Sequence, residues 1–512
     1  MRTRFVITIL LLALALGFLP AIHGAMDAKK DDVTIYETAL WGDSSAASGL
    51  AVKAATHMDQ RLFWETTFRP GSGALAETEF TYYPERRAER YDYDNTQLTV
   101  SFAESNYGIG GAFTMEELED EEEVAEIWHG AMDSLGKLWA PMVDVARRVP
   151  AGETHIEDVR VADYYEYYPM RVNLYFDSSH MNEYIYFNET KKANDLLTKF
   201  FAVEIPEAAM LNVTIRKDSY GTVQEIDCRY SDSIENEELG YLYGQELGIH
   251  TALTVDGGYM VLSREKEDPS NSYETVLASP RLKEDYGIYF FPLVEYLPEN
   301  VVSMDGRNPE RVADMEQLGN VFPLGDEVNA VNLYYYREAD QLILVTEEAG
   351  HMWTTIIDRK SMTELQKIDL GSIGEQEYVD NVLVQGDLLL VSVMELYSEE
   401  KPQRENRLVM LKQNAGSWVV ELQTPISWPD QGRYVQFDPY WQAKFCWNGE
   451  QLAIAQFENY RSSCDVYVLI CAEDELKYVG KYQRRDTNGG VYDYNRMIQP
   501  VNDGQGLEIF WE

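Results

Sequence analysis

Oxygen-bearing side chains around Gly489 and Gly490 form the pattern in this chain that best suggests metal chemistry. Asp486, Asn488 and Asp493 are candidate calcium ligands, because calcium prefers oxygen donors on a turning backbone. The segment lacks the twelve-residue loop and the final Glu of an EF-hand, so an Asx-type turn is the alternative. None of the 7 histidines has a metal-binding spacing, and the sequence indicates no cofactor.

Acid–base chemistry has one weak candidate. His155 precedes Glu157 and Asp158, which would suit a general base beside carboxylates, with a solvated loop as the alternative. Glycoside hydrolysis needs two carboxylates about 5–10 Å apart, and 87 Asp and Glu residues make any pair in the sequence uninformative. No Gly-x-Ser-x-Gly elbow occurs, and the glycines of 108–111 indicate a turn. The sequence therefore identifies no catalytic or ligand-binding residue, and a non-enzyme is favoured over an enzyme.

Tyrosines and cysteines favour structural roles. The runs Tyr164–Tyr168 and Tyr334–Tyr336 predict sheet faces, with a sugar-stacking platform as the alternative. Cys446, Cys464 and Cys471 fall in strand-like segments, where we expect buried thiols, although one disulfide within this trio stays open. Four cysteines in 512 residues are too few for a disulfide scaffold.

The charge balance limits the partners. The chain holds 43 Lys and Arg against 87 Asp and Glu, a formal charge of -44. Binding to DNA or RNA needs clustered basic side chains, so a nucleic-acid partner is excluded. A hydrophobic fraction of 45% and a charged fraction of 25% indicate a folded globular protein.

Short β-rich runs joined by tight turns fill the second half of the chain. The first three units are 331–370, 378–424 and 440–482, and each contains four such runs. Asn448-Gly449 within the third unit is a strong hairpin signal, because both central residues of such a turn need positive φ. Repeats of about 50 residues with four strands each are typical of propeller blades.

The segment Asp358–Gly371 resembles the third-to-fourth strand hairpin of many β-propellers. This resemblance implies an all-β protein, a single β-propeller of seven or eight four-stranded blades over residues 25–512. The last unit has only two strands, Tyr494–Val501 and Gly506–Glu512. Because an open sheet edge invites aggregation, we expect amino-terminal strands, Val33–Trp41 or Leu62–Phe68, to complete that blade.

A helical insertion is predicted over residues 114–140. Thr114 and Glu117 form a capping box, and acidic residues crowd the first turns of the predicted helix. Val124, Ile127 and Trp128 follow at helical spacing, so one or two helices would decorate the sheets.

Residues 1–24 predict an export signal or a membrane anchor. Arg2 and Arg4 precede the apolar run Phe5–Leu19, and small residues follow Pro20. An uncleaved anchor at residues 5–22 is the alternative, and it would be the protein's sole contact with a membrane. Both interpretations place the rest of the chain outside the cytoplasm, either secreted or anchored.

Four short segments are similar to uncharacterised cell-envelope proteins of Gram-positive bacteria. They are Val33–Glu37, Trp41–Asp43, Gly49–Val52 and Leu62–Phe68. The function predicted is an extracytoplasmic binding or sensing module of unknown ligand, with loops at one end of the propeller channel carrying the site. The alternatives are an extracytoplasmic enzyme acting on glycans or cell-wall polymers, and a scaffold for another envelope protein.

Overall fold

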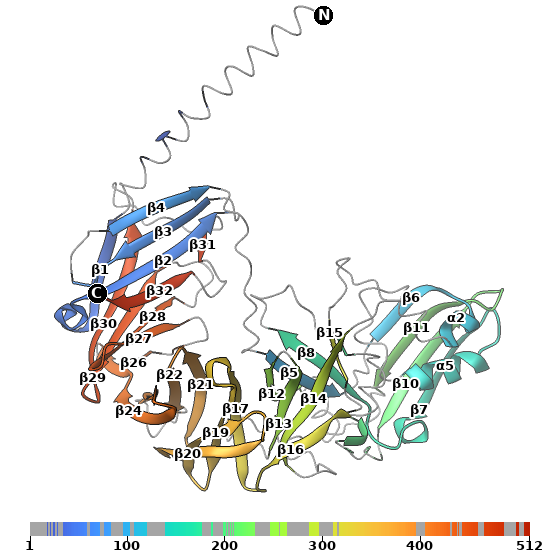
Figure 1. Ribbon diagram of the computed structural model, residues 1–512. Helices are drawn as coiled ribbons and strands as arrows, with labels where there is room; N and C mark the ends of the chain where they lie inside the picture. Colours follow the sequence, from blue (N-terminus) through green and yellow to red (C-terminus); the bar gives the residue numbers. More distant parts are fainter. Residues whose placement is uncertain are drawn as a thin grey trace, which may run out of the picture. The chain divides into compact units, whose positions relative to one another are not determined.

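A computed structural model describes most of the chain as two compact units, residues 1–90 with 373–512, and residues 91–372. The described residues are 34–58, 62–71, 76–82, 96–102, 107–119, 139–176, 186–187, 198–200, 209–230, 246–254, 256–263, 286–295, 311–314, 317–395, 405–430, 433–437, 443–458, 465–485, 498–500 and 506–512, with a few single residues between them. Antiparallel strands dominate both units, which confirms the predicted all-β, propeller-like class (Figure 1).

The first unit contains three large antiparallel sheets, here named the chain-end, middle and third sheets. The chain-end sheet joins β31 (Ile498–Pro500) and β32 (Leu507–Trp511) to β2 (Leu50–Met58), followed by β3 (Leu62–Phe68) and β4 (Ala76–Tyr82). The middle sheet has the order β1 (Thr34–Gly42), β30 (Glu475–Arg485), β29 (Val466–Ala472), β28 (Gln451–Phe457) and β27 (Lys444–Trp447). The third sheet runs from β21 (Glu377–Gln385) through β22 (Leu388–Glu395) and β23 (Arg407–Asn414) to β24 (Ser417–Pro425), and β25 (Ser427–Asp430) pairs with β26 (Arg433–Gln436).

The two ends of the chain share the chain-end sheet. Leu507 lies opposite Ala54 and Trp511 opposite Leu50, so β32 and β2 form a regular antiparallel pair. An amino-terminal strand therefore pairs with the carboxyl-terminal strand, as predicted. The partner is β2, however, and neither predicted segment: β1 pairs with β30, and β3 pairs with β2 and β4.

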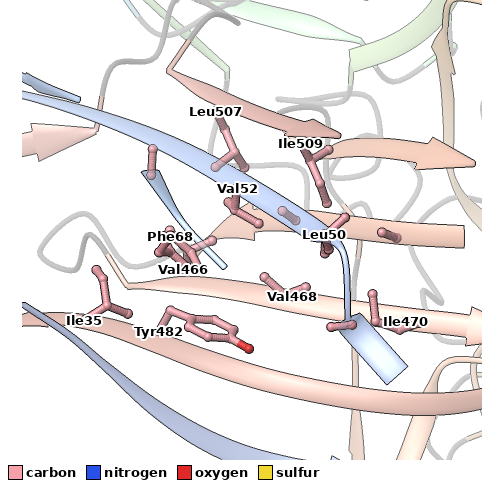
Figure 2. Packing of buried hydrophobic residues seen from close by; sticks show 14 of the residues in the cluster. Ile35, Leu50, Val52, Phe68, Val466, Val468, Ile470, Tyr482, Leu507 and Ile509 are labelled. Carbon is pink, nitrogen blue, oxygen red and sulfur yellow. The ribbon is translucent and has the colours of Figure 1, made fainter. Parts of the chain in front are cut away.

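The middle sheet is covered on both faces. On one face, Val466, Val468 and Ile470 of β29 pack in one buried cluster with Leu50 and Val52 of β2 (Figure 2). A second cluster joins the other face to the third sheet, through side chains such as Leu469 and Met410. Alternating residues of one strand thus enter two different cores, which explains why β29 is apolar along its whole length.

A buried chain of hydrogen bonds closes the first of these cores. The Tyr478 hydroxyl donates to Glu37 Oε1 at 2.8 Å and lies 2.7 Å from the Tyr482 hydroxyl. Burial raises the pKa of both phenols, so they stay protonated. This cluster ties β1 to β30, and both rings are almost fully buried, so we assign it a structural role.

Gly480 leaves room for these two rings. A Cβ at this position would lie 2.2 Å from the Tyr478 hydroxyl and 2.8 Å from Cε2 of Tyr482. Gly480→Ala should therefore lower the free energy of unfolding by about 1–3 kcal/mol, the usual effect of overpacking a core. Urea unfolding measures the loss, with Gly319→Ala in strand β16 as a comparison for a glycine whose Cβ would meet nothing within 4 Å. Equal losses in the two variants would contradict the packing explanation.

The second unit contains one large sheet and two of four strands. The large sheet has the order β8 (Met170–Phe176), β5 (Thr96–Phe102), β12 (Glu246–Leu253), β13 (Gly257–Leu262), β14 (Gly287–Glu295), β15 (Arg311–Ala313) and β9 (Tyr186–Phe187), with β16 (Gly319–Pro323) also pairing with β14. The outer sheet, as we name it, consists of β17 (Val328–Tyr336), β18 (Gln341–Glu348), β19 (His351–Asp358) and β20 (Thr363–Ser372). The helix-covered sheet has the order β6 (Tyr107–Phe113), β11 (Val223–Tyr230), β10 (Met210–Lys217) and β7 (Thr154–Arg160).

Helix α2 (Met115–Glu119) and helix α5 (Trp139–Arg148) belong to the helix-covered sheet. The capping box is confirmed, because Glu117 N donates to Thr114 Oγ1 at 3.2 Å and Thr114 N donates to Glu117 Oε2 at 2.7 Å. Helix α5 continues past residue 140, the predicted end of the insertion. The predicted apolar positions Val124, Ile127 and Trp128 lie outside the described residues.

Two smaller sequence predictions need correction. The glycines of 108–111 lie within strand β6 and not in a turn. Residues 164–168 lie outside any strand, with Tyr168 fully buried, so this tyrosine run is not a sheet face. By contrast, Tyr335 and Tyr336 lie in β17 and are buried, as the sheet prediction requires.

The predicted anchor at residues 5–22 lies, apart from Phe18 and Ala21, outside the described residues. Within the part of the chain that the structure describes, no helix is both long and apolar enough to cross a membrane.

Candidate functional site

The outer sheet carries an exposed cluster of aromatic and charged side chains around Trp353. Residues Met352–Asp358 are rich in β-branched and aromatic types, which favours the strand β19. Trp353 lies opposite Thr346 of β18 and Asp369 of β20. Directly opposed residues point to the same face of a sheet, so the indole ring and the Asp369 carboxylate share one face.

Lys367 of β20 reaches across the indole ring to β18. Its Nζ lies 4.9 Å from the Trp353 ring centroid and donates a hydrogen bond of 2.6 Å to Glu348 Oε2. The ammonium group therefore occupies the space between an aromatic face and a carboxylate. Both are groups that attract a cation.

His351 and Asp369 form the second polar pair beside the ring. The His351 Nδ1 lies 3.2 Å from Asp369 Oδ2, and the two aromatic rings of His351 and Trp353 have centroids 6.1 Å apart. The backbone N–H of Gly371 donates to Asp369 Oδ1 at 2.8 Å. That hydrogen bond, assisted by His351, lowers the pKa of Asp369, so this carboxylate is ionised at neutral pH.

We name these five side chains, Glu348, His351, Trp353, Lys367 and Asp369, the indole face. The side chains of His351 and Asp369 are each 46% exposed, and those of Lys367 and Glu348 are 36% and 35% exposed. Trp353 is half-buried, and its Nε1 has no hydrogen-bond partner among the described residues. The charged side chains of the indole face are thus accessible to solvent, and their contacts among the described residues lie within the outer sheet.

An ion cluster around the largely buried Arg359 side chain on the same sheet provides a contrast. The Arg359 guanidinium binds Asp340 of the outer sheet and donates from Nη1 to both carboxylate oxygens of Asp256, at 2.9 Å each. The Tyr335 hydroxyl completes the cluster by donating to Asp340 at 3.0 Å. Because Asp256 lies beside β13 of the large sheet, these charges join two sheets, and we assign them a structural role.

The histidine candidate from the sequence lies in strand β7 and not in a loop. His155 Nε2 is 3.3 Å from Glu157 Oε2, so the structure brings these two together, whereas Asp158 accepts a hydrogen bond from Asn212. Arg148 Nη1 of helix α5 also binds the Glu157 carboxylate, at 2.6 Å from Oε2. That guanidinium lowers the pKa of Glu157 and makes its carboxylate a poor base.

The calcium candidates Asp486, Asn488 and Asp493 all lie outside the described residues. Among the residues that are described, no group of three or more His, Cys, Asp or Glu side chains could hold a metal ion. Cys446 and Cys471 are free thiols, and burial raises the pKa of each to about 12. Cys464, the third member of the trio, also lies outside the described part of the chain.

Sequence reasoning missed the indole face. Its residues were predicted as strands, but no motif distinguishes Trp353 from the other 9 of the 10 tryptophans. The alternation of charged residues at 365–369 was the available signal, since Lys367 and Asp369 two residues apart must share a face of β20.

Comparisons with known proteins give no family. No family model matches the chain, and no curated protein matches it. The resemblance to Gram-positive envelope proteins therefore gains no support.

Several solved structures are distantly similar in fold. A neuraminidase-like protein from A/bat/Guatemala/164/2009 has 9% identity and a TM-score of 0.19, with 45% of this chain and 52% of that chain covered. A putative 6-phosphogluconolactonase from Bacteroides uniformis has 11% identity and a TM-score of 0.27, covering 90% and 99%. The NanB sialidase from Streptococcus pneumoniae has 10% identity and a TM-score of 0.20, covering 90% and 70%. This chain thus spans about half of the neuraminidase-like protein, and likenesses this weak say nothing about activity.

Proposed function

We propose that this protein is an extracytoplasmic binding or sensing module at the cell surface and that the indole face is a ligand-recognition surface. One observation carries the proposal: the indole face places a half-buried aromatic ring among solvent-accessible charges of both signs, and its contacts among the described residues stay within one sheet. By contrast, the Tyr482 cluster is buried and joins two strands, and the Arg359 cluster joins two sheets. A rigid sheet that presents exposed aromatic and charged groups is suited to recognition.

The scaffold we propose is a single β-propeller of seven or eight four-stranded blades, closed by the amino-terminal strands. The pairing of β32 with β2 supports this proposal, because propellers complete their last blade with strands from both chain ends. Export of the propeller is proposed from residues 1–24, as a cleaved signal or as an anchor at 5–22. Amino-terminal sequencing of the protein recovered from the cell envelope distinguishes the two.

A ligand screen tests the binding function. Purified residues 26–512 should gain thermal stability with at least one class of small ligand, because a ligand that binds only the folded state stabilises it. The panel contains neutral oligosaccharides, short peptides and small ammonium compounds, and Trp353→Leu is the matched variant. We expect a rise in the unfolding midpoint that grows with ligand concentration and is lost in the variant.

The same material separates the alternative functions. Turnover of a polysaccharide, abolished by one Asp or Glu substitution, would replace the binding proposal with a glycan-acting enzyme. No stabilisation by any class, together with a stable complex recovered from membranes, would replace it with a scaffold for another envelope protein.

A further inference from the structure

We propose that the indole face is a binding site for alkylammonium groups and that Lys367 occupies it in the free protein. The inference rests on the proposed binding function and names its ligand class. An ammonium group already lies at this position, 4.9 Å from the Trp353 ring centroid and 2.6 Å from Glu348 Oε2. Lys367 thus shows the kind of group that the surrounding side chains accommodate.

The charges around the ring select a cation. When the Lys367 side chain swings away, Glu348 loses its cation beside the aromatic face, while the Asp369 carboxylate stays on the same face, paired with His351. The negative face of an indole ring attracts ammonium groups, including quaternary ones. A ligand cation would restore both the contact with the ring and the charge balance beside Glu348.

Lys367 is a displaceable occupant. It and Glu348 are each about one third exposed, at 36% and 35%, and exposed ion pairs of this kind contribute little to stability. The Lys367 side chain has a flexible four-carbon stem, so it can leave the ring without a change in the backbone. The contact therefore weakens ligand binding without preventing it.

Other ligands fit the indole face less well. A neutral sugar would displace the Lys367 ammonium from the ring and leave Glu348 without its cation. A peptide strand would have to pair with the edge of β20. The pairing of β20 with β19 has two register shifts, at Met352/Trp353 and Ile356/Ile357, and irregular strands of this kind resist strand addition.

The negative charge of the whole chain also favours the binding of a cation. A formal charge of -44 raises the concentration of cations near the surface and speeds their association. Screening by salt weakens such attraction, so binding should fall as sodium chloride rises from about 0.01 M to 0.15 M.

Calorimetric and NMR titrations of residues 26–512 test the proposal with two probes, choline and N-acetyl-lysine methylamide. Lys367→Met keeps an unbranched side chain that is one atom shorter and removes its charge. We expect the Lys367→Met variant to bind at least one of the two probes at least tenfold more tightly than the unsubstituted protein does. Adding Trp353→Leu to this variant should remove the gain, and Glu348→Gln should reduce it. Stronger binding of choline would identify a quaternary ammonium ligand, and stronger binding of the lysine derivative a primary one.

Lys360→Met is the control. Lys360 is 77% exposed and pairs with Asp340, so its loss changes the net charge equally without touching the indole face. Equal gains from Lys360→Met and Lys367→Met, or a gain that survives Trp353→Leu, would overturn the inference. Stabilisation of the protein by a sugar or a peptide, but by neither ammonium probe, would also overturn the inference. That outcome would leave the proposed binding function intact. Circular dichroism confirms that each variant is folded.

Discussion

Removal of residues 506–512 should unfold the first unit. Strand β32 supplies Leu507 and Ile509 to the core of Figure 2, where they are 3% and 8% exposed. Its loss would also remove the strand that pairs with β2 from Leu50 to Ala54, on the side away from β3. Because truncating one buried Leu or Ile costs about 2–5 kcal/mol, losing both, with a strand of hydrogen bonds, approaches the whole stability of a typical domain.

Point variants make this prediction quantitative. Leu507→Ala and Ile509→Ala should each lower the free energy of unfolding by about 2–4 kcal/mol in urea titrations. Phe510→Ser is the matched control, because Phe510 lies on the opposite face of the same strand and is 43% exposed. A loss from Phe510→Ser as large as that from Ile509→Ala would show that β32 does not pack as described.

The strands were predictable from the sequence because their signals are local. Gln341–Glu347, Leu388–Tyr397 and Gln451–Glu458 are apolar runs bounded by turn residues, and all three coincide with strands to within two residues. A hairpin also forms at Asn448-Gly449, but only Gly449 has a positive φ, of 104°, so the predicted turn with two positive φ values is not the one present. An incomplete last unit was enough to predict that amino-terminal strands pair there.

The partners of the strands depend on contacts that the local sequence does not encode. Leu62–Phe68 and Leu50–Met58 have similar β propensity, and only the packing of the whole chain-end sheet decides which one meets β32. Helix α5 was missed because Pro141 stands near its start and its buried residues are nearly consecutive, which weakens a periodic signal.

The candidate site escaped prediction for a related reason. Lys367 reaches Trp353 because β19 and β20 pair with two register shifts, and a shift of one residue would place the two side chains on opposite faces. Neither shift has a marker in the sequence. The contact between Arg359 and Asp256 joins residues 103 positions apart, so no local pattern could reveal it.

The contact between Arg359 and Asp256 leads to the second prediction of a large change in stability. Arg359→Met should lower the free energy of unfolding by about 2–3 kcal/mol, because it removes the cation that Asp256 and Asp340 share and leaves Asp340 with only the exposed Lys360. The Arg359 side chain is only 11% exposed, whereas that of Asp256 is 55% exposed, so water moderates the loss. Arg337→Met is the control, since Arg337 is an exposed cation next to the same strand. Equal losses in the two variants would contradict an ion cluster between the sheets.

The effect of Arg359→Met should also depend on pH in a defined direction. Hydrogen bonds from Arg359 lower the pKa of Asp340 to about 2. Burial raises the pKa of Asp256, but hydrogen bonds from Thr254 and Arg359 outweigh it and lower that pKa as well. A carboxylate with a depressed pKa in the folded state stabilises the protein above its ordinary pKa of about 3.8, and this stabilisation is lost as pH falls toward 2.

The difference in unfolding free energy between Arg359→Met and the unsubstituted protein should therefore be constant from pH 7 to about pH 5 and shrink between pH 4 and pH 2. Toward the acid end the two carboxylates become protonated, and the arginine progressively loses the anions that it pairs with. If the difference instead stayed constant down to pH 2, the role of Arg359 would be packing against the Tyr335 ring, whose centroid lies 5.9 Å from its Cζ. The pH profile thus separates the ionic contribution from the aromatic one.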